Sequence, residues 1–224
     1  VLMEAKTGKI VSLASNPSYD PNNRPSNVIF RDPAENPIFN RAVQGIYELG
    51  STFKIFVVAY ALEQGLLSKD TKIDIRGPLW FGKYSIKDFR NYGSELTVEE
   101  IIVKSSNIGV ARIASLVGGS NLEGFYNTLG FLKSTSVELP EASQGKPLTP
   151  KKWSELSTAT AAYGHGIAVS PLHLAVAYAS IVNGGIRVFP TILNKPLNLE
   201  KGARVISENT CLLYTSDAAD DLLC

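Results

Sequence analysis

Cysteine is almost absent from this chain of 224 residues. Its two cysteines lie at positions 211 and 224, and residues 1–210 contain none. No disulfide framework can therefore hold that part of the chain together, and the redox state of its compartment cannot be read from its composition.

Strong net charge and long hydrophobic runs are absent as well. A formal net charge of +1 creates no field strong enough to recruit nucleic acid or acidic lipid. The longest apolar runs, residues 55–62 and 172–182, fall short of the roughly 18 residues of a membrane span, and the first residues do not resemble an export signal. The 44% hydrophobic and 19% charged residues are typical of a globular protein with one sizeable core.

The last stretch of the chain, CLLYTSDAADDLLC, differs in character from the rest. It is similar to a translated sequencing adapter. We therefore expect residues 211–224 to be a non-native tail that follows a single domain, residues 1–210. The alternative is a genuine short terminal helix.

Turn and capping signals predict a mostly helical domain with a strand pair at its start. The two strands flank a turn at Gly8 and need a sheet to join, because an isolated hairpin is marginal in water. Short strands and turns are expected between residues 71 and 94. The expected helices are one over 51–64 that ends at Gly65, one opened by the capping box 97–100, one over 108–117, one opened by the capping box 120–123, and one from Ser170 to Asn183.

The helix expected over residues 51–64 is apolar around nearly its whole circumference, yet Ser51 and Lys54 stand in its first turn. Residues three apart on a helix share a face, so the hydroxyl and the amine can touch. The helix dipole favours negative charge on a deprotonating serine, and burial lowers the pKa of a lysine. A neutral amine beside a serine is a general base beside its nucleophile, and the N–H groups of the first turn can form part of an oxyanion hole.

Taken alone, this spacing is weak evidence for a site. A second Ser-x-x-Lys, Ser143 to Lys146, lies between two prolines where no helix is expected to align its side chains. Ser51 and Lys54 could equally be an N-cap and a lysine whose charged end reaches solvent from a buried helix.

A second polar group, Ser105-Ser106-Asn107, lies at a break between two expected helices. At such a break, polar side chains can project into a cleft. The Ser105 hydroxyl and the Asn107 carboxamide are suited to relaying a proton and holding a substrate amide. The alternative is an ordinary helix junction with an N-cap.

Three long stretches carry a resemblance to a known family. They are NRAVQGIYELGSTFK, SSNIGVARIA and YGHGIAVSPLHLAVAYASIVNGG. Together they resemble the transpeptidase domain of class B penicillin-binding proteins, most of all the septal, cell-division type (the FtsI or PBP3 group). Ser-x-x-Lys and Ser-x-Asn occur in the family's order, and the resemblance covers residues 1 to about 210.

The resemblance implies an α+β fold of the penicillin-binding/β-lactamase-like kind, with an antiparallel sheet and a helical subdomain. It implies that Ser51 is the acylated nucleophile, that Lys54 is its base, and that Ser105 and Asn107 assist proton transfer and bind the stem peptide. The implied reaction cleaves the D-Ala–D-Ala bond of a peptidoglycan stem peptide and passes the acyl group to an amine on a neighbouring stem. β-Lactams would acylate the same serine, and no metal or organic cofactor is implied.

The resemblance also implies a cellular setting. Family members of this type act in the bacterial inner membrane, with the catalytic domain in the periplasm, and work beside other divisome proteins. The implied substrates are peptidoglycan stem peptides on lipid-linked or nascent glycan strands, and no nucleic acid partner is implied.

The family's third motif, Lys-Thr-Gly, departs from the expected order. Its only copy, Lys6-Thr7-Gly8, precedes the nucleophile and is interpreted as the hairpin turn. We therefore expect a C-terminally truncated domain whose later sheet strands and third motif are missing, and expect this chain alone to be inactive.

Two other interpretations remain. A serine β-lactamase or D,D-carboxypeptidase shares the nucleophile and base but delivers water to the acyl-enzyme, and no residue that would activate such a water stands out. A non-catalytic β-lactam sensor or divisome scaffold would keep the serine for binding only.

Overall fold

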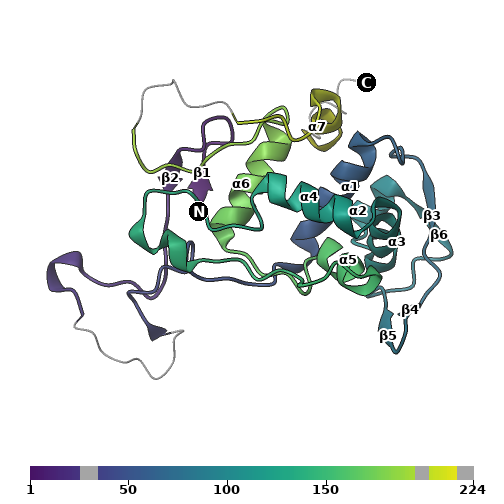
Figure 1. Cartoon of the computed structure of the whole chain (residues 1–224), viewed down its shortest axis with the longest axis horizontal. Helices are drawn as coiled ribbons and strands as arrows, with labels where there is room; N and C mark the ends of the chain where they lie inside the picture. Colours follow the sequence, from purple (N-terminus) through teal and green to yellow (C-terminus); the bar gives the residue numbers. More distant parts are fainter. Residues whose placement is uncertain (26–34, 195–201, 216–224) are drawn as a thin grey trace.

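A computed structural model of the chain describes residues 1–25, 35–194 and 202–215, and it has an α+β architecture (Figure 1). Its helices are α1 (Lys54–Glu63), α2 (Val98–Val103), α3 (Asn107–Val117), α4 (Gly119–Leu129), α5 (Glu155–Ala162), α6 (Pro171–Val182) and α7 (Glu208–Thr215). Its strands are β1 (Leu2–Met3), β2 (Ile10–Ser12), β3 (Lys72–Asp74), β4 (Leu79–Phe81), β5 (Tyr84–Ile86) and β6 (Glu95–Thr97). Three 3-10 turns are η1 (Pro21–Asn23), η3 (Gly50–Phe53) and η4 (Pro140–Gln144).

The strands form three antiparallel pairs, β1–β2, β3–β6 and β4–β5. The β1–β2 hairpin confirms the expected turn at Gly8, whose φ is +75° and whose Cα lies so near the Phe189 carbonyl that no side chain would fit. This hairpin joins a third segment through a parallel bridge between Lys9 and Thr191. The other two pairs lie at the far end of the molecule (Figure 1).

Helix α1 lies inside the domain, as its apolar circumference predicts. It packs against α2, α3, α4, α5 and α7. At its N-terminal end, Phe53, Phe56, Tyr126 and Phe131 form a buried aromatic cluster with ring centroids 4.8–5.8 Å apart. Burying one such ring contributes roughly 1.5–3 kcal/mol. The first turn of α1 is therefore held on a rigid base.

Most of the expected helix boundaries are confirmed. The capping box of Thr97 and Glu100 opens α2, and Ser170 caps α6, which ends at Asn183. The capping box expected at residues 120–123 is wrong, because α4 already begins at Gly119 with Gly118 as its N-cap and without a side-chain cap. Gly118 (φ +83°) also ends α3, so one glycine makes the whole corner between the two helices.

Helix α5 was not expected from the sequence, and α7 overlaps the stretch for which a short terminal helix was only the alternative. Helix α5 begins after the N-cap Ser154 and packs against α3. Helix α7 packs on α1 and α6, with the Cys211 side chain buried between them. The assignment of residues 211–224 to a non-native tail stays a prediction, and residues 216–224 lie outside the described part of the chain.

None of the helices within the described ranges is long and apolar enough to cross a membrane.

Candidate active site

The backbone of the turn that carries Ser51 is held from both sides by hydrogen bonds. Gly50 has a left-handed backbone (φ +57°) and donates its N–H to the Gly164 carbonyl at 3.3 Å. The Tyr178 hydroxyl, from α6, donates to the Thr52 carbonyl at 2.8 Å. Ser51 itself lies in η3 and is exposed. A reactive hydroxyl at this place would therefore face solvent on a fixed backbone.

Lys54, the first residue of α1, is buried, with only 3% of its surface exposed. Its Nζ donates to the Ser105 carbonyl at 2.6 Å and pairs with the Ser105 hydroxyl at 2.8 Å. Burial is the larger effect on the Lys54 amine and lowers its pKa from 10.5 to about 8. The charge of the nearby Asp88 carboxylate acts in the opposite direction and raises this pKa. A pKa of about 8 leaves roughly a tenth of the amines neutral at pH 7, whereas the ordinary value leaves almost none.

The backbone between Ser51 and Lys54 explains how the two side chains share a face. Residues 50–53 are a 3-10 helix, with three residues per turn, so side chains at i and i+3 eclipse one another. The sequence predicted that the hydroxyl and the amine can touch. Among the described residues, however, the hydrogen bonds of Lys54 Nζ go to Ser105 and not to Ser51. Lys54 thus belongs to the Ser51 group by its position in the chain and to the Ser105–Asn107 group by its hydrogen bonds.

The junction between α2 and α3 holds Ser105 in an unusual conformation. Its φ of +58° makes it the one non-glycine residue with a left-handed backbone in the described ranges. Such a conformation costs on the order of 1–3 kcal/mol and persists only where the surroundings enforce it. Here it turns the Ser105 carbonyl and hydroxyl toward the same amine.

Asn107 is the first residue of α3 and is half-buried. Its Nδ2 donates to the Lys87 carbonyl at 3.1 Å. The intervening Ser106 is fully buried and serves as the N-cap, accepting the Gly109 N–H at 2.9 Å. The tripeptide is therefore both a helix junction and a polar group beside Lys54, so the two interpretations of it are compatible.

Asp88 was missed by the sequence reasoning. Its carboxylate accepts the Ser106 hydroxyl at 2.7 Å, the Asn107 N–H at 2.5 Å and the Ile108 N–H at 3.0 Å. Negative charge is favoured at a helix N-terminus, and charge-assisted hydrogen bonds are roughly twice as strong as neutral ones. Asp88 therefore fixes the start of α3 from a loop 18 residues earlier, a distance that no local pattern reveals.

The second Ser-x-x-Lys does not form a comparable arrangement. Ser143 lies in η4, a short 3-10 helix that the neighbouring prolines argued against, and Lys146 follows after its end. Both side chains are exposed. Within the described residues, no group of three or more His, Cys, Asp or Glu side chains could hold a metal ion.

An exposed hydroxyl one turn from a buried amine, with a second hydroxyl on that amine, is suited to acyl transfer through a serine. The chain matches the family described as the penicillin binding protein transpeptidase domain over residues 1–215, and it belongs to that family.

Curated relatives are similar to the chain over most of its length. The chain is 38% identical over 205 residues to a probable peptidoglycan D,D-transpeptidase FtsI of Caulobacter vibrioides, covering 91% of this chain and 33% of the relative. It is 34% identical over 215 residues to the peptidoglycan D,D-transpeptidase FtsI of Escherichia coli K12, covering 93% and 34%. The chain therefore spans about a third of the length of these relatives.

Solved structures show the same fold. A peptidoglycan glycosyltransferase from Burkholderia ambifaria superposes with a TM-score of 0.78 at 28% identity, covering 93% of this chain and 60% of that one. The transpeptidase domain of penicillin-binding protein 3 from Burkholderia pseudomallei gives 0.77 at 27% identity, covering 93% and 57%. The expected α+β fold of a penicillin-binding transpeptidase domain is confirmed.

Proposed function

We propose that this chain is part of a peptidoglycan D,D-transpeptidase of septal cell-wall synthesis. Membership in the transpeptidase family and the names of the relatives in Caulobacter and Escherichia support this proposal. The observation that carries it is the buried Lys54 amine, which lies one turn from Ser51, hydrogen-bonds Ser105, and has a pKa lowered to about 8. A lysine in that state can act as a base near neutral pH.

In this proposal, Lys54 activates Ser51 in its neutral form. A neutral amine has two N–H groups and one lone pair. The N–H groups can go to the Ser105 carbonyl and hydroxyl, which leaves the lone pair for the Ser51 proton. Ser51 Oγ attacks the carbonyl carbon of the D-Ala–D-Ala bond, and N–H groups of the first turn stabilise the negative charge that develops on the carbonyl oxygen.

The later proton transfers run through the same three residues. The C–N bond of the tetrahedral intermediate breaks, and the leaving D-alanine amine receives a proton that Lys54 returns through the Ser105 hydroxyl. The amine of a second stem then attacks the seryl ester, gives up a proton to Lys54, and expels Ser51 Oγ, which regains its proton. Asn107 holds the stem-peptide amide in this scheme.

The remaining parts of the proposal concern the protein to which the chain belongs. Residues 1–210 form a partial transpeptidase domain, and a Lys-Thr-Gly placed after the second motif completes the cleft from outside these residues. β-Lactams acylate Ser51, and the complete protein is anchored in the bacterial inner membrane with this domain in the periplasm, among divisome proteins.

Labelling with a fluorescent penicillin tests the proposal. In a parent protein that contains these residues, Ser51→Ala should abolish labelling, and mass spectrometry should place the adduct of the unmodified protein on Ser51. Ser143→Ala, in the second Ser-x-x-Lys, is the matched control and should label normally. Labelling that survives Ser51→Ala contradicts the proposal. Acyl-enzyme lifetime separates the alternatives, because slow deacylation supports transfer and rapid turnover supports hydrolysis.

A further inference from the structure

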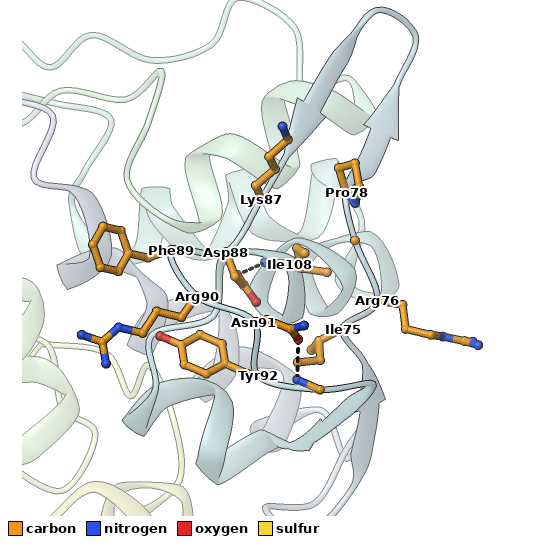
Figure 2. Close-up of a pocket in the computed structure, with 12 residues that line it drawn as sticks. Ile75, Arg76, Pro78, Lys87, Asp88, Phe89, Arg90, Asn91, Tyr92 and Ile108 are labelled. Carbon is orange, nitrogen blue, oxygen red and sulfur yellow. Dashed lines mark hydrogen bonds between the residues drawn. The ribbon is translucent and has the colours of Figure 1, made fainter.

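An open pocket of about 480 Å³ lies beside the N-terminus of α3. Its walls are the segment 75–78, the loop 87–93 and the side chain of Ile108 (Figure 2). This volume lies within the range of pockets that bind small ligands. The proposed acyl-transfer chemistry at Ser51 does not use it.

Two positive charges on this pocket have no acidic partner in the described part of the chain. Lys87 and Arg90 are exposed, and neither forms an ion pair with a carboxylate of the described residues. Their side chains leave the loop in different directions, so the charged ends stand at separate parts of the rim (Figure 2). A third cation, Arg76, is already paired with Asp74 at 2.8 Å.

Among the described residues, Asp88 is the one acid that lines the pocket, and its single negative charge can offset at most one of these two cations. Asp88 spends its two carboxylate oxygens on the Ser106 hydroxyl and on the N–H groups of Asn107 and Ile108. The pocket therefore keeps an excess of positive charge in a chain whose net charge is only +1. Two cations without an ion pair are too few to hold a nucleic acid, so a small acidic ligand fits better.

The pocket also offers apolar surface to such a ligand. The Phe89 side chain is 89% exposed, with the Arg90 guanidinium 5.9 Å from its ring centroid. Ile75, Pro78 and Tyr92 add further apolar atoms to the lining. A large aromatic ring left in solvent beside an unpaired cation is typical of a surface that meets another molecule.

The place of the pocket connects it to the candidate active site. Asp88 lines the pocket on one side and holds Ser106 and Asn107 on the other, and its charge acts on Lys54. A substrate that reaches Ser51 and continues past Asn107 would therefore meet the loop 87–93.

We propose that this pocket binds a carboxylate-bearing segment of the stem peptide, away from the bond that is cleaved, and that the positive charges of Lys87 and Arg90, at separate parts of its rim, both favour the negative charge. This inference rests on the proposed function, because it takes a peptidoglycan stem as the substrate. It adds that the enzyme distinguishes stems by the charge of a residue before D-Ala–D-Ala. Amidation of that carboxylate would weaken binding, since it removes the charge and keeps the size.

Peptide titration of the 224-residue chain tests the proposal directly. The probes are the pentapeptide L-Ala-γ-D-Glu-L-Lys-D-Ala-D-Ala and the same peptide with the D-Glu α-carboxylate amidated, followed by amide NMR. The acidic peptide should shift the signals of Gly77, Gly93 and Ile108 and bind about tenfold more tightly than the amidated one, as expected for two exposed cations that attract one carboxylate without both touching it. Lys87→Gln/Arg90→Gln should remove that tenfold difference.

A second double variant separates a local effect from net charge. Lys151→Gln/Lys152→Gln removes two exposed lysines outside the pocket and should bind both peptides as the unmodified chain does. Equal weakening in both double variants, equal affinity for the two peptides, or no peptide binding would each overturn the proposal. NMR shifts that appear only with acidic peptides unrelated to a stem would also overturn the proposal, because they would assign the pocket to an acidic protein partner.

The titration also stays separate from the proposed chemistry. Ser51→Ala should keep the tenfold preference for the acidic over the amidated peptide, because the residues that distinguish the two lie in the loop 87–93. If the unmodified parent shows no penicillin labelling of Ser51, the transpeptidase function is rejected and the pocket result still stands. Normal labelling of the parent, with no effect of Lys87→Gln/Arg90→Gln on peptide binding, would reject the pocket alone.

Discussion

The Ser51–Lys54 turn is continuous with α1 and is held by the core beneath it and by Gly164 and Tyr178, whereas the 105–107 junction is held by an aspartate from another loop. The first part has regular backbone, η3 followed by α1, over a buried aromatic cluster. The second has a left-handed serine and depends on Asp88 and on the Lys54 amine. Local spacing can therefore place a hydroxyl and an amine one turn apart, but the burial that makes the amine a base and the partner that relays the proton must come from tertiary contacts.

The largest effect should come from removing the base in the first part. In the parent protein, Lys54→Ala should lower the rate of penicillin acylation about a thousandfold, since general bases contribute about 10²–10⁴. The Lys104→Ala variant is the control, because this lysine forms only a surface ion pair with Glu100. A rate within tenfold of the unmodified protein would show that Lys54 is not the base.

The pH dependence of acylation should report the same amine. With a pKa lowered to about 8, the neutral fraction of Lys54 rises about fiftyfold between pH 6 and pH 8. The rate should rise in parallel and level off above pH 8, because only the neutral form accepts the Ser51 proton. Stopped-flow labelling at fixed ionic strength measures this profile. A half-maximal rate near pH 10, as for an ordinary lysine, would contradict the role of burial.

Removing Asp88 should affect both parts of the site. Asp88→Ala leaves the Ser106 hydroxyl and two N–H groups of α3 without their acceptor, so acylation should fall about tenfold and stability by about 2 kcal/mol. The midpoint of the pH profile should also move below about 8, since the Asp88 charge raises the pKa of Lys54.

The shift of the midpoint distinguishes an electrostatic role of Asp88 from a purely structural one. Asp74→Ala removes an aspartate of β3 that pairs with Arg76 and should leave the midpoint unchanged. If Asp88→Ala slows acylation without moving the midpoint of the pH profile, the Asp88 carboxylate supports the site only by holding the start of α3 in place.

The smallest effect should come from the backbone of Ser105. Glycine adopts φ of +58° without strain, so Ser105→Gly should be about 0.5–1 kcal/mol more stable than Ser105→Ala. The matched pair at Ser115, exposed within α3, should show the opposite order, because glycine is unfavourable inside a helix. Urea unfolding measures both pairs. The same order at both positions would mean that the left-handed turn is not strained.

Parts of this fold could be predicted because their signals are local. The turn at Gly8, the capping box at Thr97 and the N-cap at Ser170 each depend on a few neighbouring residues, and each is confirmed. Helix α5 could not be predicted, because its stretch ELSTATAA has little apolar periodicity and becomes helical on packing against α3. The role of Asp88 could not be predicted either, because its hydrogen-bond partners lie at the start of α3, far along the chain.

The amino acids alone determine the order of the motifs along the chain, the apolar character of α1 and the three-residue spacing of Ser51 and Lys54. Helix geometry then places residues three apart on one face. The burial of the Lys54 amine, its hydrogen bonds to Ser105, and the anchoring of Asn107 by Asp88 were decided only when distant segments packed together. A pKa depends on how much water and which charges surround a group, and those are properties of the packed molecule.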